Sequence, residues 1–190
     1  MKLLSLNTSL VQDLIIDGQT HRSGIRKQPR DGSVAVQPLG LEGDEQADLS
    51  VHGGLPKAVY AYPSEHYPFW QTVRAQAGAA AWGEALPFGS LGENLSLQGL
   101  MESQAWIGDM LRFEGGVELL VSEPRYPCFK FNAVMGFNKA SKLMAQSGWC
   151  GFYLAVKTPG SLRAGEAFEL LPGPREVGIA ELFAAKMRKG

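Results

Sequence analysis

The sequence predicts a mainly β protein whose short strands form a closed or nearly closed barrel, with a few helices at the periphery. Two observations favour this fold class. Twenty-three glycines and eleven prolines are spread along the 190 residues, which is typical of many short strands joined by tight turns. Few helical segments intervene between the strand-like segments, and closing a sheet into a barrel leaves no long exposed edge.

Strand-like segments dominate the first third of the chain. Residues 2–7, 11–16 and 32–37 carry β-branched residues or leucine between Asp-Gly turn signals, a pattern typical of strands. Residues 57–62 predict a further strand of the same kind. The first third therefore contributes strands to the barrel and no helix.

A helix is expected after these strands. Tyr67, Trp70, Val73 and Ala77 fall near one helical face, and this periodicity predicts a helix that buries them. Pro68 leaves the start of the helix open, because proline is tolerated only in a first turn.

The second half of the chain returns to strands before it ends in a helix. Residues 109–113 and 117–122 flank a Gly-Gly pair and predict a hairpin. Asn138 is a plausible N-cap for a helix that Gly148 would close. Strands are expected at residues 149–156 and 166–171.

A terminal amphipathic helix is predicted at residues 176–188. Its apolar positions recur at helical spacing, at Ile179, Leu182, Phe183 and Met187. At 190 residues the chain is long enough for one full core. We therefore predict one barrel domain at residues 1–173, with residues 174–190 as a short helix and no separate domain.

Charge and cysteine usage exclude several classes of function. The formal net charge is −1, which argues against broad binding of nucleic acid or membrane surfaces. Two cysteines make neither a disulfide framework nor a Cys-x-x-Cys metal site. Cys150 lies in an apolar run and is expected in the core. No segment has the pattern of a signal peptide or a membrane span, so the protein is expected to be cytoplasmic.

The most informative segment surrounds the other cysteine. Cys128 follows Pro127 directly, with Pro124 and Arg125 before it and Lys130 after it. Prolines fix φ and stiffen the loop, while cations stabilise a thiolate, the form that acts as nucleophile or metal ligand. The alternative is a buried cysteine that packs as a small hydrophobic residue.

Glycine-rich segments precede this loop. Residues 40–44 (GLEGD) are followed by His52, Gly53 and Gly54. Glycines permit positive φ, and successive amides in such turns can form anion-binding nests. Tight turns that only join strands are the commoner outcome for glycine motifs alone.

Three further polar residues could contact a ligand. Arg26 and Lys27 stand beside a turn and could clamp a phosphate, although such pairs are more often solvated. Asn94 offers both a donor and an acceptor to the edge of a heterocycle. Its alternative role is to stabilise its own turn.

Seven segments occur in a characteristic order: 40–44 (GLEGD), 51–54 (VHGG), 58–63 (AVYAYP), 65–67 (EHY), 88–95 (FGSLGENL), 107–109 (IGD) and 124–130 (PRYPCFK). Together they resemble the MOSC family, named after the C-terminal domain of molybdenum cofactor sulfurases. The resemblance covers about residues 24–171 and is strongest to the YiiM-like branch. That branch usually carries a helical C-terminal extension, whereas here one predicted helix follows the barrel.

The resemblance implies a β-barrel that binds the molybdenum cofactor. It implies that Cys128 ligates the metal, or carries sulfur as in the sulfurases, and a thiolate suits a soft metal centre. The other residues that the family pattern places at the cofactor are Arg26, Lys27, Asp44, His52, Gly53, Gly54, Asn94, Arg125 and Lys130. The family is also associated with binding of pyridoxal phosphate.

Three functions follow as hypotheses. The first is reduction of N-hydroxylated compounds, of the hydroxylaminopurine type that the YiiM-like branch detoxifies. A separate redox protein would supply electrons, because the chain has no flavin or nicotinamide motif. The second is a non-catalytic carrier of the cofactor or of its sulfur, as a Cys128 persulfide. The third is a barrel that binds another phosphorylated ligand, with Cys128 structural.

Overall fold

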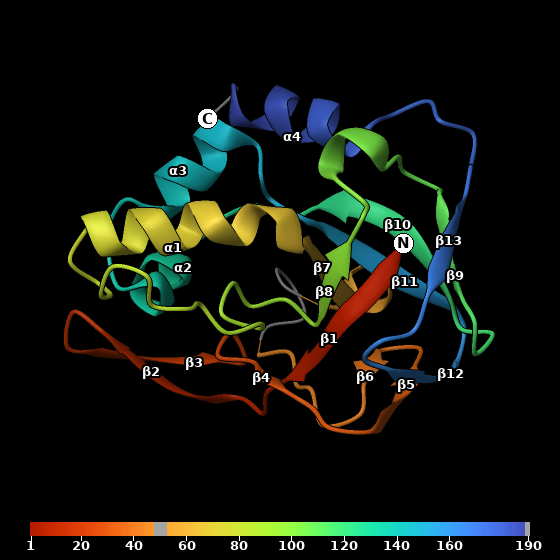
Figure 1. The fold of residues 1–190 in the computed structure, drawn as a ribbon, viewed down its shortest axis with the longest axis horizontal. Coiled ribbons are helices and arrows are strands. Elements are labelled where there is room, and N and C mark those ends of the chain that lie inside the picture. Colours follow the sequence, from red (N-terminus) through yellow and green to blue (C-terminus); the bar gives the residue numbers. More distant parts are fainter. Residues whose placement is uncertain (48–52, 189–190) are drawn as a thin grey trace.

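A single large sheet forms the centre of the protein (Figure 1). The computed structural model describes residues 1–47 and 53–188. The sheet has eight strands in the order β13-β9-β10-β11-β7-β8-β1-β4. In chain order the strands are β1 (Lys2–Thr8), β4 (Gln28–Pro29), β7 (Val59–Pro63), β8 (Leu95–Gln98), β9 (Met110–Phe113), β10 (Glu118–Pro124), β11 (Phe152–Thr158) and β13 (Phe168–Leu171). All pairs are antiparallel except β7 with β8.

The predicted mainly β fold with a few helices is confirmed, but closure of the predicted closed or nearly closed barrel is wrong for the described residues, because no sheet closes on itself. β13 and β4 are the two edges of the large sheet. The N-terminal end of β1 approaches the segment before β13 through an isolated bridge between Lys2 and Ala167. The Leu3 N–H donates to the Glu166 carbonyl at 2.9 Å. The Gly165 N–H donates to the Leu3 carbonyl at 2.7 Å and the Phe168 N–H to the Met1 carbonyl at 3.1 Å, so a few backbone hydrogen bonds join the two sides without a continuous ladder.

Two smaller sheets complete the β structure. One has the order β12-β5-β6, formed by β12 (Gly160–Arg163), β5 (Ser33–Gln37) and β6 (Gly40–Leu41). The other is the hairpin of β2 (Gln12–Ile16) with β3 (Gln19–Ser23). Both lie below the large sheet in Figure 1, on the side away from the helices.

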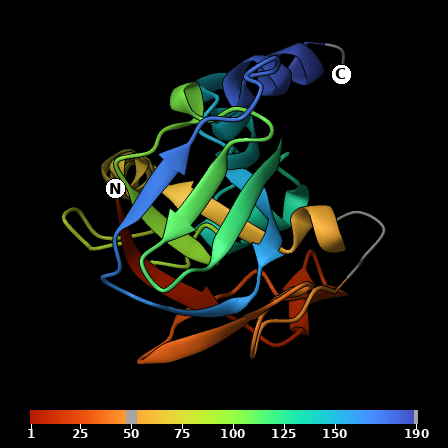
Figure 2. The same cartoon turned by 90° about the vertical axis from the view of Figure 1, so that its right-hand side faces the viewer.

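The helices gather on the other side of the molecule. They are α1 (Tyr67–Gln76), α2 (Phe129–Met135), α3 (Ala140–Ser147) and α4 (Ile179–Met187). Three short 3₁₀ turns are η1 (Leu55–Lys57), η2 (Ser64–His66) and η3 (Glu102–Gln104), of which η1 packs against β10 and β11. In Figures 1 and 2, α4 lies at the end of the molecule opposite the β5-β6-β12 sheet. No helix among residues 1–47 and 53–188 is long and apolar enough to cross a membrane.

The elements that hydrophobic periodicity predicted are present. α1 begins at Tyr67 with Pro68 in its first turn and buries Trp70 completely. α3 ends at Gly148, which adopts the left-handed conformation, but its N-cap is Lys139 and not Asn138. The sequence prediction missed α2, because its seven residues are too short for a clear helical period.

α4 shares the core of the sheet. Its buried residues Ile179 and Phe183 belong to the same apolar cluster as the central strands. The backbone before α4 is tied to the loop before β9, because the Ile107 N–H donates to the Val177 carbonyl at 2.9 Å and the Ile179 N–H to the Ala105 carbonyl at 2.9 Å.

Residues 149–151 join the helices to the sheet. The Tyr62 hydroxyl donates to the Trp149 carbonyl at 3.0 Å, and the Tyr60 hydroxyl to the Cys150 carbonyl at 2.8 Å. Cys150 is fully buried, as predicted, and burial raises the pKa of its thiol. The Gly151 N–H donates to the buried Glu102 carboxylate at 2.7 Å.

Gly151 has φ +64° and faces the backbone of β7. A Cβ here would overlap the Ala61 carbonyl oxygen and lie 2.8 Å and 2.9 Å from ring carbons of Tyr60 and Tyr62. Glycine is therefore required both for the backbone conformation and for the close approach of the two strands.

We predict that Gly151→Ala destabilises the protein by about 2–5 kcal/mol, since it combines left-handed strain with overpacking. Gly148→Ala is the matched control, because Gly148 has φ +72° and open space around it. It should cost only about 1–2 kcal/mol. Urea unfolding measures both, and equal losses would show that the contact with β7 does not matter.

Candidate functional site

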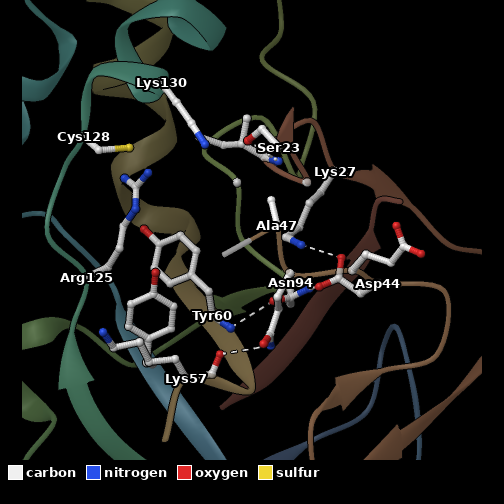
Figure 3. Close-up of a pocket in the computed structure, with 16 residues that line it drawn as sticks. Ser23, Lys27, Asp44, Ala47, Lys57, Tyr60, Asn94, Arg125, Cys128 and Lys130 are labelled. Atoms are coloured by element: carbon white, nitrogen blue, oxygen red, sulfur yellow. Dashed lines mark hydrogen bonds and ion pairs between the residues drawn. The ribbon is translucent and has the colours of Figure 1, made fainter. Parts of the chain in front are cut away.

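A cavity of about 110 Å³ lies where the C-terminal end of β10 meets β7, β11 and the segments after β3 and β6 (Figure 3). Its walls combine a thiol, four cations, two tyrosines and several polar groups. The residues that line it are Ser23, Gly24, Ile25, Lys27, Asp44, Glu45, Gln46, Ala47, Lys57, Tyr60, Gly92, Asn94, Arg125, Cys128, Lys130 and Tyr153.

Cys128 lies at the N-cap of α2 and is partly exposed. Its carbonyl oxygen accepts hydrogen bonds from the Phe131 N–H at 3.0 Å and from the Ser141 hydroxyl at 2.8 Å. These bonds fix the backbone of Cys128 to both α2 and α3. In Figure 3 the Cys128 sulfur points into the cavity, on the side where the Arg125 guanidinium lies. The position therefore presents a thiol and does not bury it.

Arg125 is 4% exposed and is a buried cation of the cavity. Its guanidinium lies over the rings of Tyr60 and Phe131, 5.3 Å and 4.8 Å from their centroids, an arrangement that stabilises a cation. Burial would lower the pKa of Arg125, but its electrostatic interactions with Tyr60, Tyr153 and Cys128 raise it. Arg125 thus places a positive charge close to the Cys128 thiol, where it favours a thiolate or another anion.

Asp44 is the centre of a buried polar cluster on the opposite wall. One carboxylate oxygen accepts from the Ser9 N–H at 2.9 Å and pairs with the Lys27 ammonium. The other accepts from the Asn94 amide at 2.9 Å. Lys27 and the Asp44 side chain are only 8% and 5% exposed. Lys27 is therefore a buried, paired cation and not an exposed clamp.

Asn94 uses its whole side-chain amide within the protein. Its oxygen accepts from the Tyr60 N–H at 3.0 Å, and its nitrogen donates to the Asn7 carbonyl at 3.1 Å as well as to Asp44. Asn94 thereby links β1, β7 and Asp44. This geometry supports the alternative that asparagine stabilises local structure, and leaves no unused donor for the edge of a pterin.

The neighbouring Glu93 holds the 88–95 segment in place. It is fully buried, and burial raises the pKa of its carboxyl group. The carboxylate accepts from the Gly89 N–H at 2.8 Å, the Leu91 N–H at 3.1 Å and the Ser96 hydroxyl at 2.7 Å, and contacts the Tyr67 hydroxyl. These bonds fix the backbone of the segment. Glu93 itself does not line the cavity, whereas Gly92 and Asn94 of the same segment do.

The structure brings most of the predicted site residues together. Those that line the cavity are Lys27, Asp44, Asn94, Arg125, Cys128 and Lys130. Arg26 is exposed and does not line it, and neither do Gly53 and Gly54. His52 lies outside the described residues. The role of each of these residues toward a cofactor stays a prediction.

Lys57, Tyr60 and Tyr153 are among the residues of the cavity wall that sequence reasoning missed. Tyr60 and Tyr153 form an aromatic pair with ring centroids 5.4 Å apart. Lys57 lies 5.9 Å above the Tyr153 ring and 3.6 Å from the Glu123 carboxylate. Tyr60 belongs to one of the motif segments, but strand alternation alone did not show which face meets a ligand. Tyr153 lies in an apolar run that gave no signal beyond burial.

The cations and the thiol of the cavity are chemically compatible with an anionic ligand. Among residues 1–47 and 53–188 no group of three or more His, Cys, Asp or Glu side chains could hold a metal ion alone. A single soft thiol can supply one further ligand to a metal already held by sulfur donors. The buried Arg125 and the partly exposed Lys130 would offset negative charge on such a ligand.

Comparison with known proteins gives consistent matches. The family model of the MOSC domain matches residues 48–169. The chain is 38% identical to the uncharacterized protein YflK of Bacillus subtilis (strain 168) over 185 residues, 97% of this chain and 79% of YflK. It is 37% identical to protein YiiM of Escherichia coli (strain K12) over 162 residues, 85% of this chain and 70% of YiiM.

Two further matches are a solved structure and a protein named as a reductase. The crystal structure of YiiM from Geobacillus stearothermophilus superimposes with a TM-score of 0.76 at 28% identity, covering 99% of this chain and 84% of that one. A protein named reductase from Gibberella moniliformis (strain M3125 / FGSC 7600) is 35% identical over 152 residues, 80% of this chain. That match spans only 26% of the fungal protein.

The geometry predicts different outcomes for the two adjacent cations of the expected clamp. Lys27→Ala leaves the buried Asp44 carboxylate without its counter-ion and should cost about 3–5 kcal/mol of stability. Arg26→Ala removes an exposed charge and should change stability by less than about 0.5 kcal/mol. Urea unfolding distinguishes the two variants. A Lys27→Ala protein as stable as Arg26→Ala would contradict the structural role of the Lys27–Asp44 pair.

Proposed function

Because the chain belongs to the MOSC domain family, in its YiiM-like branch, we propose that it binds the molybdenum cofactor and reduces N-hydroxylated compounds at a centre ligated by Cys128. The observation that carries the proposal is the shared cavity of Cys128 and Arg125. It combines a soft ligand with a buried cation at one point, which is what an anionic, metal-bearing cofactor requires.

The residues present fit this cofactor. When bound, the cofactor supplies a redox-active molybdenum. Cys128 would contribute the protein ligand, and Arg125 would offset negative charge next to it. Lys130 lines the same cavity. Its ammonium uses one donor on the Arg22 carbonyl at 2.9 Å, and its further donors could contact an anionic group. The Tyr60–Tyr153 pair offers an aromatic wall for a planar ring system.

Arg26 and the Gly53-Gly54 turn have no place in this arrangement, since they do not line the cavity. We therefore assign the anionic part of the cofactor to Arg125 and Lys130, with Lys27 as a structural partner of Asp44. Burial raises the pKa of Tyr60 and of Tyr153, so both hydroxyl groups stay protonated near neutral pH. Neither tyrosine then adds a negative charge that would repel the ligand.

The proposed reaction converts an N-hydroxylated compound and two electrons, with two protons, into the amine and water. The reductase-named relative supports a reductive chemistry. Electrons would come from a separate redox protein, because the chain has no flavin or nicotinamide motif. N-hydroxylated bases such as hydroxylaminopurine are the proposed substrate class, with detoxification as the outcome.

The alternative is a carrier of the cofactor or of its sulfur, without turnover. The partial exposure of Cys128 favours this candidate, because a persulfide must be reached by an acceptor. Both functions use the same thiol, and measurements of metal content and turnover distinguish them.

We predict that protein purified from a cofactor-competent host contains molybdenum and pterin in near-equal amounts. Metal analysis and pterin fluorescence measure both, with a known molybdoenzyme from the same host as the loading control. If that enzyme is loaded and this protein carries neither component, the proposed cofactor is wrong.

Cys128→Ser should abolish reduction of hydroxylamine-type substrates with near-normal thermal stability, because a hydroxyl is a poor ligand for a soft metal. Cys150→Ser is the matched control. It places a hydroxyl in the core, costs about 1–3 kcal/mol, and should keep activity per folded molecule. A fully active Cys128→Ser protein would refute the assignment. Lost activity with retained molybdenum would favour a sulfur-carrying or redox role for Cys128.

A further inference from the structure

The C-terminal helix contacts the segment that carries Cys128. Tyr126 lies two residues before Cys128. Unlike Arg125 and Cys128, it does not line the cavity. Its ring lies parallel to that of Phe183 of α4, with centroids 5.7 Å apart and an interplanar angle of 9°. The Lys186 ammonium lies 4.0 Å from the centroid of the Tyr126 ring. Tyr126 is therefore held by two side chains of α4.

α4 is well placed to fix this ring. Phe183 and Lys186 are three residues apart, so they are neighbours on one helical face. Phe183 is 1% exposed and belongs to the core, which anchors that face. A lysine ammonium over a tyrosine ring adds a cation–π interaction. α4 therefore contacts Tyr126 with the buried Phe183 ring and with the charged Lys186 ammonium.

A short segment, with Pro127 at its centre, connects the Tyr126 ring to the Cys128 thiol. Arg125 and Tyr126 are consecutive, and their side chains go to different places: Arg125 into the cavity and Tyr126 onto α4. Pro127 follows and fixes its own φ near about −65°. A displacement of Tyr126 would act on Cys128 through this segment, together with the hydrogen bonds that the Cys128 carbonyl accepts from Phe131 and Ser141, and would change the distance between the thiol and Arg125.

We infer that Tyr126, Phe183 and Lys186 form a clamp through which the C-terminal helix positions Cys128 in the cavity. Tyr126 and Lys186 are positioning residues, because they act on the site through the backbone of the 125–128 segment. The inference rests on the proposed role of Cys128, but the order of the segment can be measured without any cofactor.

Amide hydrogen exchange of the 124–132 peptide tests the clamp in the full-length protein. Lys186→Met removes the cation and keeps most of the aliphatic stem. It should speed exchange of this peptide by roughly 2- to 30-fold, the range that corresponds to a cation–π interaction. Tyr126→Leu should have a larger effect. Lys186→Arg and Tyr126→Phe keep the cation and the ring, and should restore wild-type exchange.

Lys142→Met is the matched control, since Lys142 is an exposed lysine of α3. It should leave the 124–132 peptide unchanged, and exchange in β13 should stay the same in every variant. Unchanged exchange of the 124–132 peptide in both Lys186→Met and Tyr126→Leu overturns the inference. So does equal acceleration throughout the protein, which would indicate general destabilisation.

The rate at which iodoacetamide alkylates Cys128, followed by peptide mass spectrometry, gives a second readout. We expect this rate to change in Lys186→Met and to return to the wild-type value in Lys186→Arg. An identical rate in all variants contradicts positioning of the thiol by α4. Absence of molybdenum from the wild-type protein would overturn the proposed function alone, because exchange and alkylation still decide whether the clamp exists.

Discussion

The close approach of Gly151 to β7 is the constraint on which the sheet, the helices and the cavity all depend. The carbonyls of Trp149 and Cys150 accept from the hydroxyls of Tyr62 and Tyr60, and the Gly151 N–H reaches the buried Glu102 carboxylate. These bonds are possible only because no side chain at position 151 separates β11 from β7. The Tyr60 ring held in this way also lies under the Arg125 guanidinium. The Gly151 carbonyl also accepts from the Arg125 N–H at 3.5 Å, so the position of this buried charge depends on packing at Gly151.

Polar groups around the cavity divide into two sets by their hydrogen bonds. Asp44, Lys27 and Asn94 satisfy one another and join β1 to β7, so their chemistry is used in folding. Arg125 is stabilised by aromatic rings and a sulfur contact with Met144 at 3.2 Å. A cation held by neutral partners keeps its charge available to a ligand, whereas one paired with a carboxylate is largely neutralised. The wall that carries Cys128 is therefore the one whose buried cation can act on an anionic ligand.

Much of this arrangement could be predicted from local sequence. The periodicity around Trp70 and Phe183 identified α1 and α4, because burial of one helical face leaves a clear repeat. The motif order identified the family and the cysteine loop. The closed barrel was wrong, since sequence does not show how far two edge strands run beside each other. Arg26 and Lys27 were treated alike, although one is exposed and the other buried, because adjacent residues of a short turn can point in opposite directions.

The sequence by itself determined which chemical groups the protein carries: a thiol directly after a proline, cations on either side of it, and glycines where the backbone must turn. It also determined the mainly β composition, since strand propensity and turn residues act locally. Only the tertiary structure decided which cation meets the thiol and which is neutralised by Asp44. It also decided that α4 contacts Tyr126 from outside the cavity. Those outcomes depend on contacts between residues far apart in the chain, and such contacts are fixed by packing of the whole core.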